Sequence, residues 1–85
     1  MIRRSIEEDF AVTEDVLFAD GLDTAIIGFD PNLWKVVYSR KKVVDVLMRR
    51  DGMGEDEAIE FAEFNIFGAY IGKKTPIFIE DYNRL

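Results

Sequence analysis

Residues 24–50 read TAIIGFDPNLWKVVYSRKKVVDVLMRR, and this stretch carries the strongest structural signals in the chain. The nearly continuous apolar run 24–29 predicts a strand, in which Gly28 indicates a bulge or a close approach of another backbone. Pro and its acidic and amide neighbours predict a turn at residues 30–32. A second strand is expected over residues 33–38. Two apolar runs joined by a short turn indicate an antiparallel hairpin.

A helix is predicted directly after this hairpin, over residues 40–50. Its apolar residues repeat at i, i+4, which is the helical spacing, and Ser39 stands where an N-cap belongs. Two arginines in the last turn suit the negative end of the helix dipole. Gly52 can adopt the left-handed conformation that ends a helix. The apolar repeat comprises Val43, Val44, Val46, Leu47 and Met48.

A second helix is expected from residue 55 to residue 67 or 68, with Gly54 as its cap and Glu57 three residues later. Its apolar face comprises Ala58, Ile59, Ala62 and Ile66, and its polar face comprises Asp56, Glu60 and Glu63. Residues 77–79 predict a final short strand. The order β-β-α-α-β predicts an α+β fold, in which a small antiparallel sheet carries a helical hairpin on one face.

The first fifteen residues are polar and weakly patterned. We expect residues 1–15 to form an N-terminal arm that is either helical or disordered, and residues 16–85 to form a single α+β domain. If the arm is helical, Ser5 and Glu8 have the spacing of a capping box. The apolar run Val16-Leu17-Phe18-Ala19 predicts a short strand or an irregular packed segment.

The composition excludes several kinds of chemistry. The 85 residues include no Cys and no His, which excludes disulfides, thiolate nucleophiles and imidazole metal sites. The formal net charge of −6 disfavours binding to nucleic acid and to an anionic membrane surface. No apolar run approaches the roughly 20 residues of a membrane span, and no signal peptide is recognisable. We therefore expect a cytoplasmic protein that binds neither nucleic acid nor membrane.

The acidic second helix does not match a metal or catalytic motif. A calcium loop counted from Asp51 needs Gly at its sixth position and Glu at its twelfth, but Asp56 and Ala62 stand there. Glu60 and Glu63 lie one turn apart, a spacing that glycosidase carboxylates can share with any acidic helix. We interpret the acidic run as a solvated face and expect no metal, no cofactor and no catalytic residues.

The first helix is basic, and the second is acidic. The basic residues are Arg40, Lys41, Lys42, Arg49 and Arg50. A helix–turn–helix is conceivable from the short connection, but its recognition helix would present carboxylates to phosphates. We favour charge pairing between the two helices, either within the chain or across a dimer.

Aromatic residues recur at every third position from the second helix onward, at Phe61, Phe64, Phe67 and Tyr70. We favour the interpretation that they belong to the core alone. The alternative is that a helix that is apolar most of the way round is buried on two sides, and that a partner covers the second side. The predicted partner surface comprises Asp56, Glu60, Glu63, Phe64, Phe67 and Tyr70. Asn65 interrupts the apolar stretch, and we expect its amide to be buried and bonded to the backbone near Gly68 or to the strand at Thr75. The alternative is that Asn65 contacts a ligand together with Tyr70.

Residues 51–78 resemble the C-terminal part of a family of small uncharacterised proteins encoded by bacteriophages and some bacteria. The resemblance rests on Asp51-Gly52-Met53, Glu57-Ala58, Phe64-Asn65, Gly68-Ala69-Tyr70 and Thr75-Pro76-Ile77, and AIIGFD at 25–30 is similar to a strand of that family. Gly54 stands where the family pattern suggests a Ser cap. The family has no established activity, so the resemblance implies a phage or bacterial setting and no catalytic role.

Three functional hypotheses remain open from the sequence. The first is a small, acidic, non-enzymatic interaction protein that self-associates into a homo-oligomer. The second is a modulator or inhibitor of a host or phage protein, which binds through an acidic face. The third is a small-ligand binding protein or enzyme, which requires a concave pocket with convergent polar groups.

Overall fold

The computed structural model describes residues 2–10, 16–69 and 71–82. Its elements follow the order α-β-β-α-α-β, with two short irregular helices between them. They are α1 (Ile2–Asp9), the 3₁₀ turn η1 (Asp23–Ala25), β1 (Ile26–Asp30), β2 (Lys35–Ser39), α2 (Arg40–Asp51), α3 (Glu55–Ala62), the π-helical η2 (Glu63–Phe67) and β3 (Ile77–Ile79). The α+β class is as expected.

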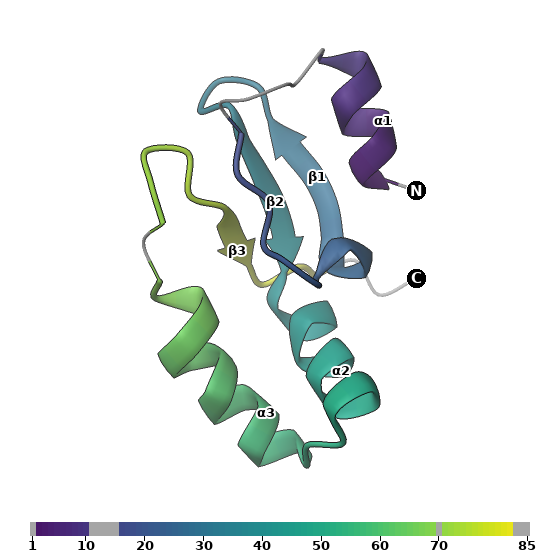
Figure 1. Cartoon of the computed structure of the whole chain (residues 1–85), viewed down its shortest axis with the longest axis vertical. Helices are drawn as coiled ribbons and strands as arrows, with labels where there is room; N and C mark the ends of the chain where they lie inside the picture. Colours follow the sequence, from purple (N-terminus) through teal and green to yellow (C-terminus); the bar gives the residue numbers. More distant parts are fainter. Residues whose placement is uncertain (1, 11–15, 70, 83–85) are drawn as a thin grey trace.

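The three strands form one mixed sheet with the order β1-β2-β3. The β1–β2 hairpin is antiparallel, as predicted, whereas β3 pairs parallel to β2. The expectation of a purely antiparallel sheet is therefore wrong. The chain leaves the end of β2 into α2, and α3 returns antiparallel to it (Figure 1). Residues 71–76 approach the sheet at the starting end of β2, so β3 runs in the same direction as β2 (Figure 1).

The hairpin has the local features that its sequence indicates. The register shifts between Ile26 and Gly28, which is the predicted bulge. At the turn, the Asp30 carboxylate accepts hydrogen bonds from the backbone N–H groups of Asn32 (2.9 Å) and Leu33 (3.1 Å). Trp34 closes the turn with a φ of 59°.

Helix α2 begins and ends at the predicted signals. The Ser39 hydroxyl accepts from the backbone N–H of Lys42 at 3.2 Å, which is an N-cap. Gly52 has a φ of 70°, and its N–H donates to the Leu47 carbonyl. In α3, the Glu57 carboxylate accepts from the N–H of Gly54 at 3.4 Å.

The α2–α3 hairpin meets the sheet at the end of β2 and extends away from it (Figure 1). This placement differs from the expected packing across one sheet face.

The N-terminal helix α1 contains Ser5 within its length, so the predicted Ser5 cap is wrong. Ile6 is the buried residue of α1 and belongs to the hydrophobic core. The Arg3 guanidinium donates to both carboxylate oxygens of Asp23, at 3.0 and 3.1 Å, and lies 4.0 Å from the centre of the Phe18 ring. These contacts join α1 to Phe18 and to η1.

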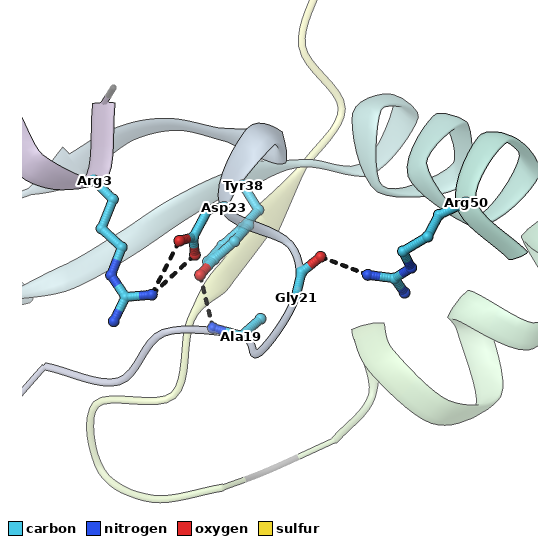
Figure 2. A network of polar contacts seen from close by, with 6 residues as sticks. All are labelled: Arg3, Ala19, Gly21, Asp23, Tyr38 and Arg50. Carbon is cyan, nitrogen blue, oxygen red and sulfur yellow. Dashed lines mark hydrogen bonds and ion pairs between the residues drawn. The ribbon is translucent and has the colours of Figure 1, made fainter.

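Residues 16–22, which we call the strap, form an irregular segment that crosses the sheet at β2 (Figure 1). This agrees with the second of the two alternatives for Val16-Leu17-Phe18-Ala19. The backbone N–H of Ala19 donates to the Tyr38 hydroxyl at 2.7 Å, and Arg50 Nη1 donates to the Gly21 carbonyl at 2.7 Å (Figure 2). The strap is thereby joined to both the sheet and α2.

A single hydrophobic core joins the sheet to the helical hairpin. It includes the strap, α1 and the inner faces of α2 and α3. The most deeply buried side chains come from β1, β2 and α2, and two buried alanines allow α3 to approach closely. These residues are Ile26, Val36, Tyr38, Val43, Leu47, Ala58 and Ala62.

Candidate interaction surface

Helix α3 and its π-helical extension η2 carry the predicted partner surface. Asp56, Glu60 and Glu63 are exposed, and the Phe64 side chain is 79% exposed. Such exposure is unusual for a large aromatic side chain. Phe67 is half-buried, and Tyr70 lies outside the described residues. The structure therefore places most of the predicted residues on accessible parts of one helical element.

Phe67 faces a different direction from Phe64. Its ring centre lies 5.3 Å from that of Phe78 on β3, and the Arg40 guanidinium lies 4.7 Å from its centre. The hydrogen bonds of a π-helix span one residue more than those of an α-helix. This geometry turns Phe67 toward α2, into line with Ile59 and Glu63. The aromatic spacing suggested one surface, but the π-helical turn divides it into two.

A groove of about 250 Å³, which we call the hairpin groove, runs between the outer sides of α2 and α3. Its apolar floor is formed by Val44, Ile59 and Phe67. Ile59 is 39% exposed, whereas Val44 is half-buried. The rim consists of charged side chains, namely Arg40, Lys41 and Asp45 from α2, Glu55 and Glu63 from α3 and η2, and Glu80 after β3.

The two sides of the hairpin groove carry opposite charges that are not paired with each other. Among the described residues, the ion pairs are Arg3–Asp23, Arg4–Glu8 and Arg50–Asp51, and none joins α2 to α3. The predicted charge pairing between the helices within the chain is therefore wrong. The exposed Lys41 at one side and the exposed Glu55 and Glu63 at the other remain accessible to a partner.

Asn65 does not occupy the buried position expected from the sequence. It is exposed, and its Nδ2 donates to the Phe61 carbonyl at 3.1 Å, one turn back along the helix. Thr75 instead bonds the loop that contains it, where its hydroxyl accepts from the Ile71 N–H at 3.3 Å. The amide therefore supports the end of α3 rather than a distant strand.

Within residues 2–10, 16–69 and 71–82, no group of three or more carboxylates is placed to hold a metal ion. The hydrogen-bonded Arg50 lowers the pKa of the Asp51 carboxyl. That pair lies at the C-terminal end of α2, away from the hairpin groove.

The α2 side of the groove was not predictable from the sequence as part of a surface with α3. The sequence pattern indicates only that Val44 and Ile59 lie on apolar faces and that Arg40 and Lys41 belong to a basic helix. The sequence contains one indication of this surface, because Ile59 lies on the same side of a helix as Glu55 and Glu63. The complementary residues of α2 can be included only once the antiparallel pairing of the two helices is known.

Comparisons with protein-family models, with curated proteins and with solved structures found no match to this chain. None of the helices in the described ranges is long and apolar enough to cross a membrane.

Proposed function

We propose that this protein is a small, non-enzymatic interaction protein that self-associates through the hairpin groove. The observation that carries the proposal is the unpaired opposite charge on the two sides of an apolar floor. A surface of this kind is complementary to a second copy of itself, which is the requirement of a two-fold interface. Val44, Ile59 and Phe67 would supply the apolar contact, and the charged rims would set the orientation.

The arrangement of the helices supports one of two possible two-fold geometries. Lys41 lies near the start of α2, and Glu63 begins η2 directly after α3, so both lie at the same end of the antiparallel hairpin. A two-fold axis parallel to the helices places α2 of one copy over α3 of the other. Lys41 of each copy then faces Glu63 of its partner, so that each such contact occurs twice. An axis across the helices would instead place basic α2 against basic α2.

The resemblance to small phage and bacterial proteins supports the cytoplasm of a bacterial or phage-infected cell as the setting of this proposal. The same acidic helix also motivates the alternative of a modulator that binds a host or phage protein. The specific observation in its favour is the exposed Phe64 on the outer side of α3, which the hairpin groove does not include.

A charge-exchange experiment tests the proposed dimer. We expect Lys41→Glu and Glu63→Lys each to weaken dimerisation, because each replaces two attractive contacts with two repulsive ones. The double variant K41E/E63K restores the pair with reversed polarity, and we expect its dissociation constant to return close to that of the unmodified protein. Exposed pairs contribute up to about 1 kcal/mol each, so each single change should raise the dissociation constant by about tenfold or more.

The matched control is Lys73→Glu, which changes the charge equally at an exposed residue away from the groove. Sedimentation equilibrium of the four variants provides the dissociation constants. If Lys73→Glu weakened dimerisation as much as Lys41→Glu does, the effect of Lys41→Glu would come from the change in net charge alone. A double variant as weak as either single one would argue against the proposed pairing.

A further inference from the structure

A second concave surface lies on the opposite side of α3 from the hairpin groove. This cavity of about 460 Å³ is lined by the strap, the end of α2, α3 with η2, and five residues that follow η2, namely Ala69, Ile71, Thr75, Pro76 and Phe78. Its volume falls within the range of about 300–1,000 Å³ that is typical of ligand sites. The walls are predominantly apolar, and their large side chains are Phe18, Leu22, Leu47, Phe61, Ile66 and Phe78. We call it the strap cavity.

Specific hydrogen bonds hold the strap wall of the cavity in place. Ala19, which lines the cavity, is joined through its N–H to the buried Tyr38 hydroxyl (Figure 2). On the far side, Arg50 reaches from α2 to the Gly21 carbonyl, and its guanidinium also pairs with Asp51. A wall fixed from two sides reduces the ordering cost that a ligand must overcome on binding.

The strap cavity continues onto an acidic aromatic surface. Phe61 and Asn65 line both the cavity and a neighbouring shallow depression of about 360 Å³. The depression is completed by Glu57, Glu60 and the highly exposed Phe64. The combined surface is therefore elongated, with an apolar pocket at one end and an exposed aromatic ring with two carboxylates at the other.

The charge at the rim of the combined surface is negative. Arg50 is the single basic residue that lines either hollow in the described ranges, and Asp51 pairs with it at 3.0 Å. Asp20, Glu57 and Glu60 are exposed and take part in none of the ion pairs among the described residues. A cationic ligand is therefore favoured over an anionic one, because unlike potentials attract across an interface.

We propose that the strap cavity and the adjoining depression bind a basic segment of another protein. One large apolar side chain of that segment enters the cavity, and its Lys or Arg residues lie along Glu57 and Glu60. The elongated shape favours a peptide chain over a small molecule, because the exposed Phe64 and the carboxylates lie beyond the cavity itself. This site does not depend on the proposed dimer, since it uses Phe61 and Asn65 rather than Ile59 and Glu63.

Three synthetic peptides test the proposed chemistry. The probe is Lys-Lys-Ala-Ala-Leu-Phe-Ala-Ala-Lys-Lys, and its matched forms replace either the four Lys by Glu or the Leu-Phe pair by Ala-Ala. Binding is followed by amide chemical shifts of the isotope-labelled full chain. We expect the Lys peptide to bind at least tenfold more tightly than either matched form. The shifts should concentrate at Leu22, Phe61 and Ile66.

Two variants locate the binding on the protein. Glu57→Gln with Glu60→Gln should weaken binding of the Lys peptide by about tenfold. Glu7→Gln with Asp9→Asn makes the same change of charge on α1 and should have little effect.

Ala19→Leu places a larger side chain toward the strap cavity and should abolish binding, with Thr24→Leu as its control outside the cavity. If Ala19→Leu fails to fold, the charge variants still decide the question.

Several results would overturn the proposal. The first is that the Lys and Glu peptides bind with equal affinity. The second is that Glu7→Gln with Asp9→Asn weakens the Lys peptide as much as Glu57→Gln with Glu60→Gln does. The third is that the chemical-shift changes concentrate at Val44 and Ile59 of the hairpin groove. Preferential binding of the Ala-Ala form would also contradict it, because no apolar side chain would then be needed. A protein that dimerises but binds none of the peptides would overturn this inference and leave the proposed function intact.

Discussion

The backbone N–H of Ala19 donates a 2.7 Å hydrogen bond to the hydroxyl of Tyr38, which is fully buried in the central strand β2. This bond holds the strap against the sheet. The same tyrosine ring stacks on Phe78 of β3, with ring centres 5.2 Å apart. One side chain therefore joins the strap, the central strand and the parallel edge strand. The positions of the strap cavity and of its Phe78 wall both depend on it.

Replacing Tyr38 by Phe should destabilise the protein. The change removes the acceptor for the Ala19 N–H and leaves a partly buried donor unpaired, which costs about 1–3 kcal/mol. The phenyl ring itself retains its packing. Urea denaturation followed by circular dichroism measures the change against the unmodified protein. An unchanged stability of Tyr38→Phe would show that the hydroxyl does not anchor the strap.

Alkaline pH should destabilise the protein through the same residue. Burial raises the pKa of the Tyr38 hydroxyl above its ordinary value of 10.0. The folded state therefore retains this proton more strongly than the unfolded state. The resulting stabilisation is fully present below the unfolded pKa and is lost as the pH rises through the folded pKa.

Denaturation midpoints between about pH 8 and pH 11 test this dependence. The unmodified protein should lose stability more steeply above about pH 10 than Tyr38→Phe does. The two proteins differ in one titratable group, so the difference between their stability curves isolates Tyr38. If both proteins lost stability equally as the pH rises, the ionisation of Tyr38 would not be linked to folding.

The two glycines that flank the α2–α3 turn should respond oppositely to substitution. Gly52 has a φ of 70°, so Gly52→Ala forces a side chain into the left-handed region at a cost of about 1–2 kcal/mol. Gly54 has an extended backbone with open space around it, and Gly54→Ser adds a capping hydroxyl worth a few tenths of a kcal/mol. Thermal denaturation of both variants measures the pair. Equal effects would exclude the assigned capping roles.

Phe64 should contribute little to folding despite its size. Its side chain is 79% exposed, so Phe64→Ser should change the free energy of unfolding by no more than about 0.5 kcal/mol. Phe78→Ser is the informative contrast, because that ring packs between Tyr38 and Phe67, and its loss should cost several-fold more. Urea denaturation compares them. A large loss from Phe64→Ser would mean that this ring supports the fold rather than a binding surface.

The features that were predictable from the sequence are local ones. Ser39 caps α2 and Gly52 ends it, because both signals act within four residues of the helix. The bulge at Gly28 and the turn at Asp30 are equally local. The direction of β3 was not predictable in this way. It depends on the end of the sheet at which the chain arrives after α3 and η2, which three apolar residues at 77–79 do not specify.

The candidate surface was predictable only in part, for the same reason. Helical spacing placed Glu60 on the polar side of α3, where it is exposed, and Phe64 in η2 is exposed as well. It could not show that a π-helical turn directs Phe67 toward α2, because that geometry follows from how the end of α3 packs against β3. Asn65 was misjudged because its nearest partner, the Phe61 carbonyl, lies on its own helix.

The mass of the protein in solution, measured by light scattering at low and at high salt, tests the proposed self-association most directly. We expect a dimer at low salt that dissociates toward the monomer as salt rises, because the charges at the rim of the hairpin groove are exposed and are therefore screened. A dimer that is equally stable at both salts would indicate an interface without these charges. A monomer at both salts, at concentrations up to about 1 mM, would contradict self-association through the hairpin groove.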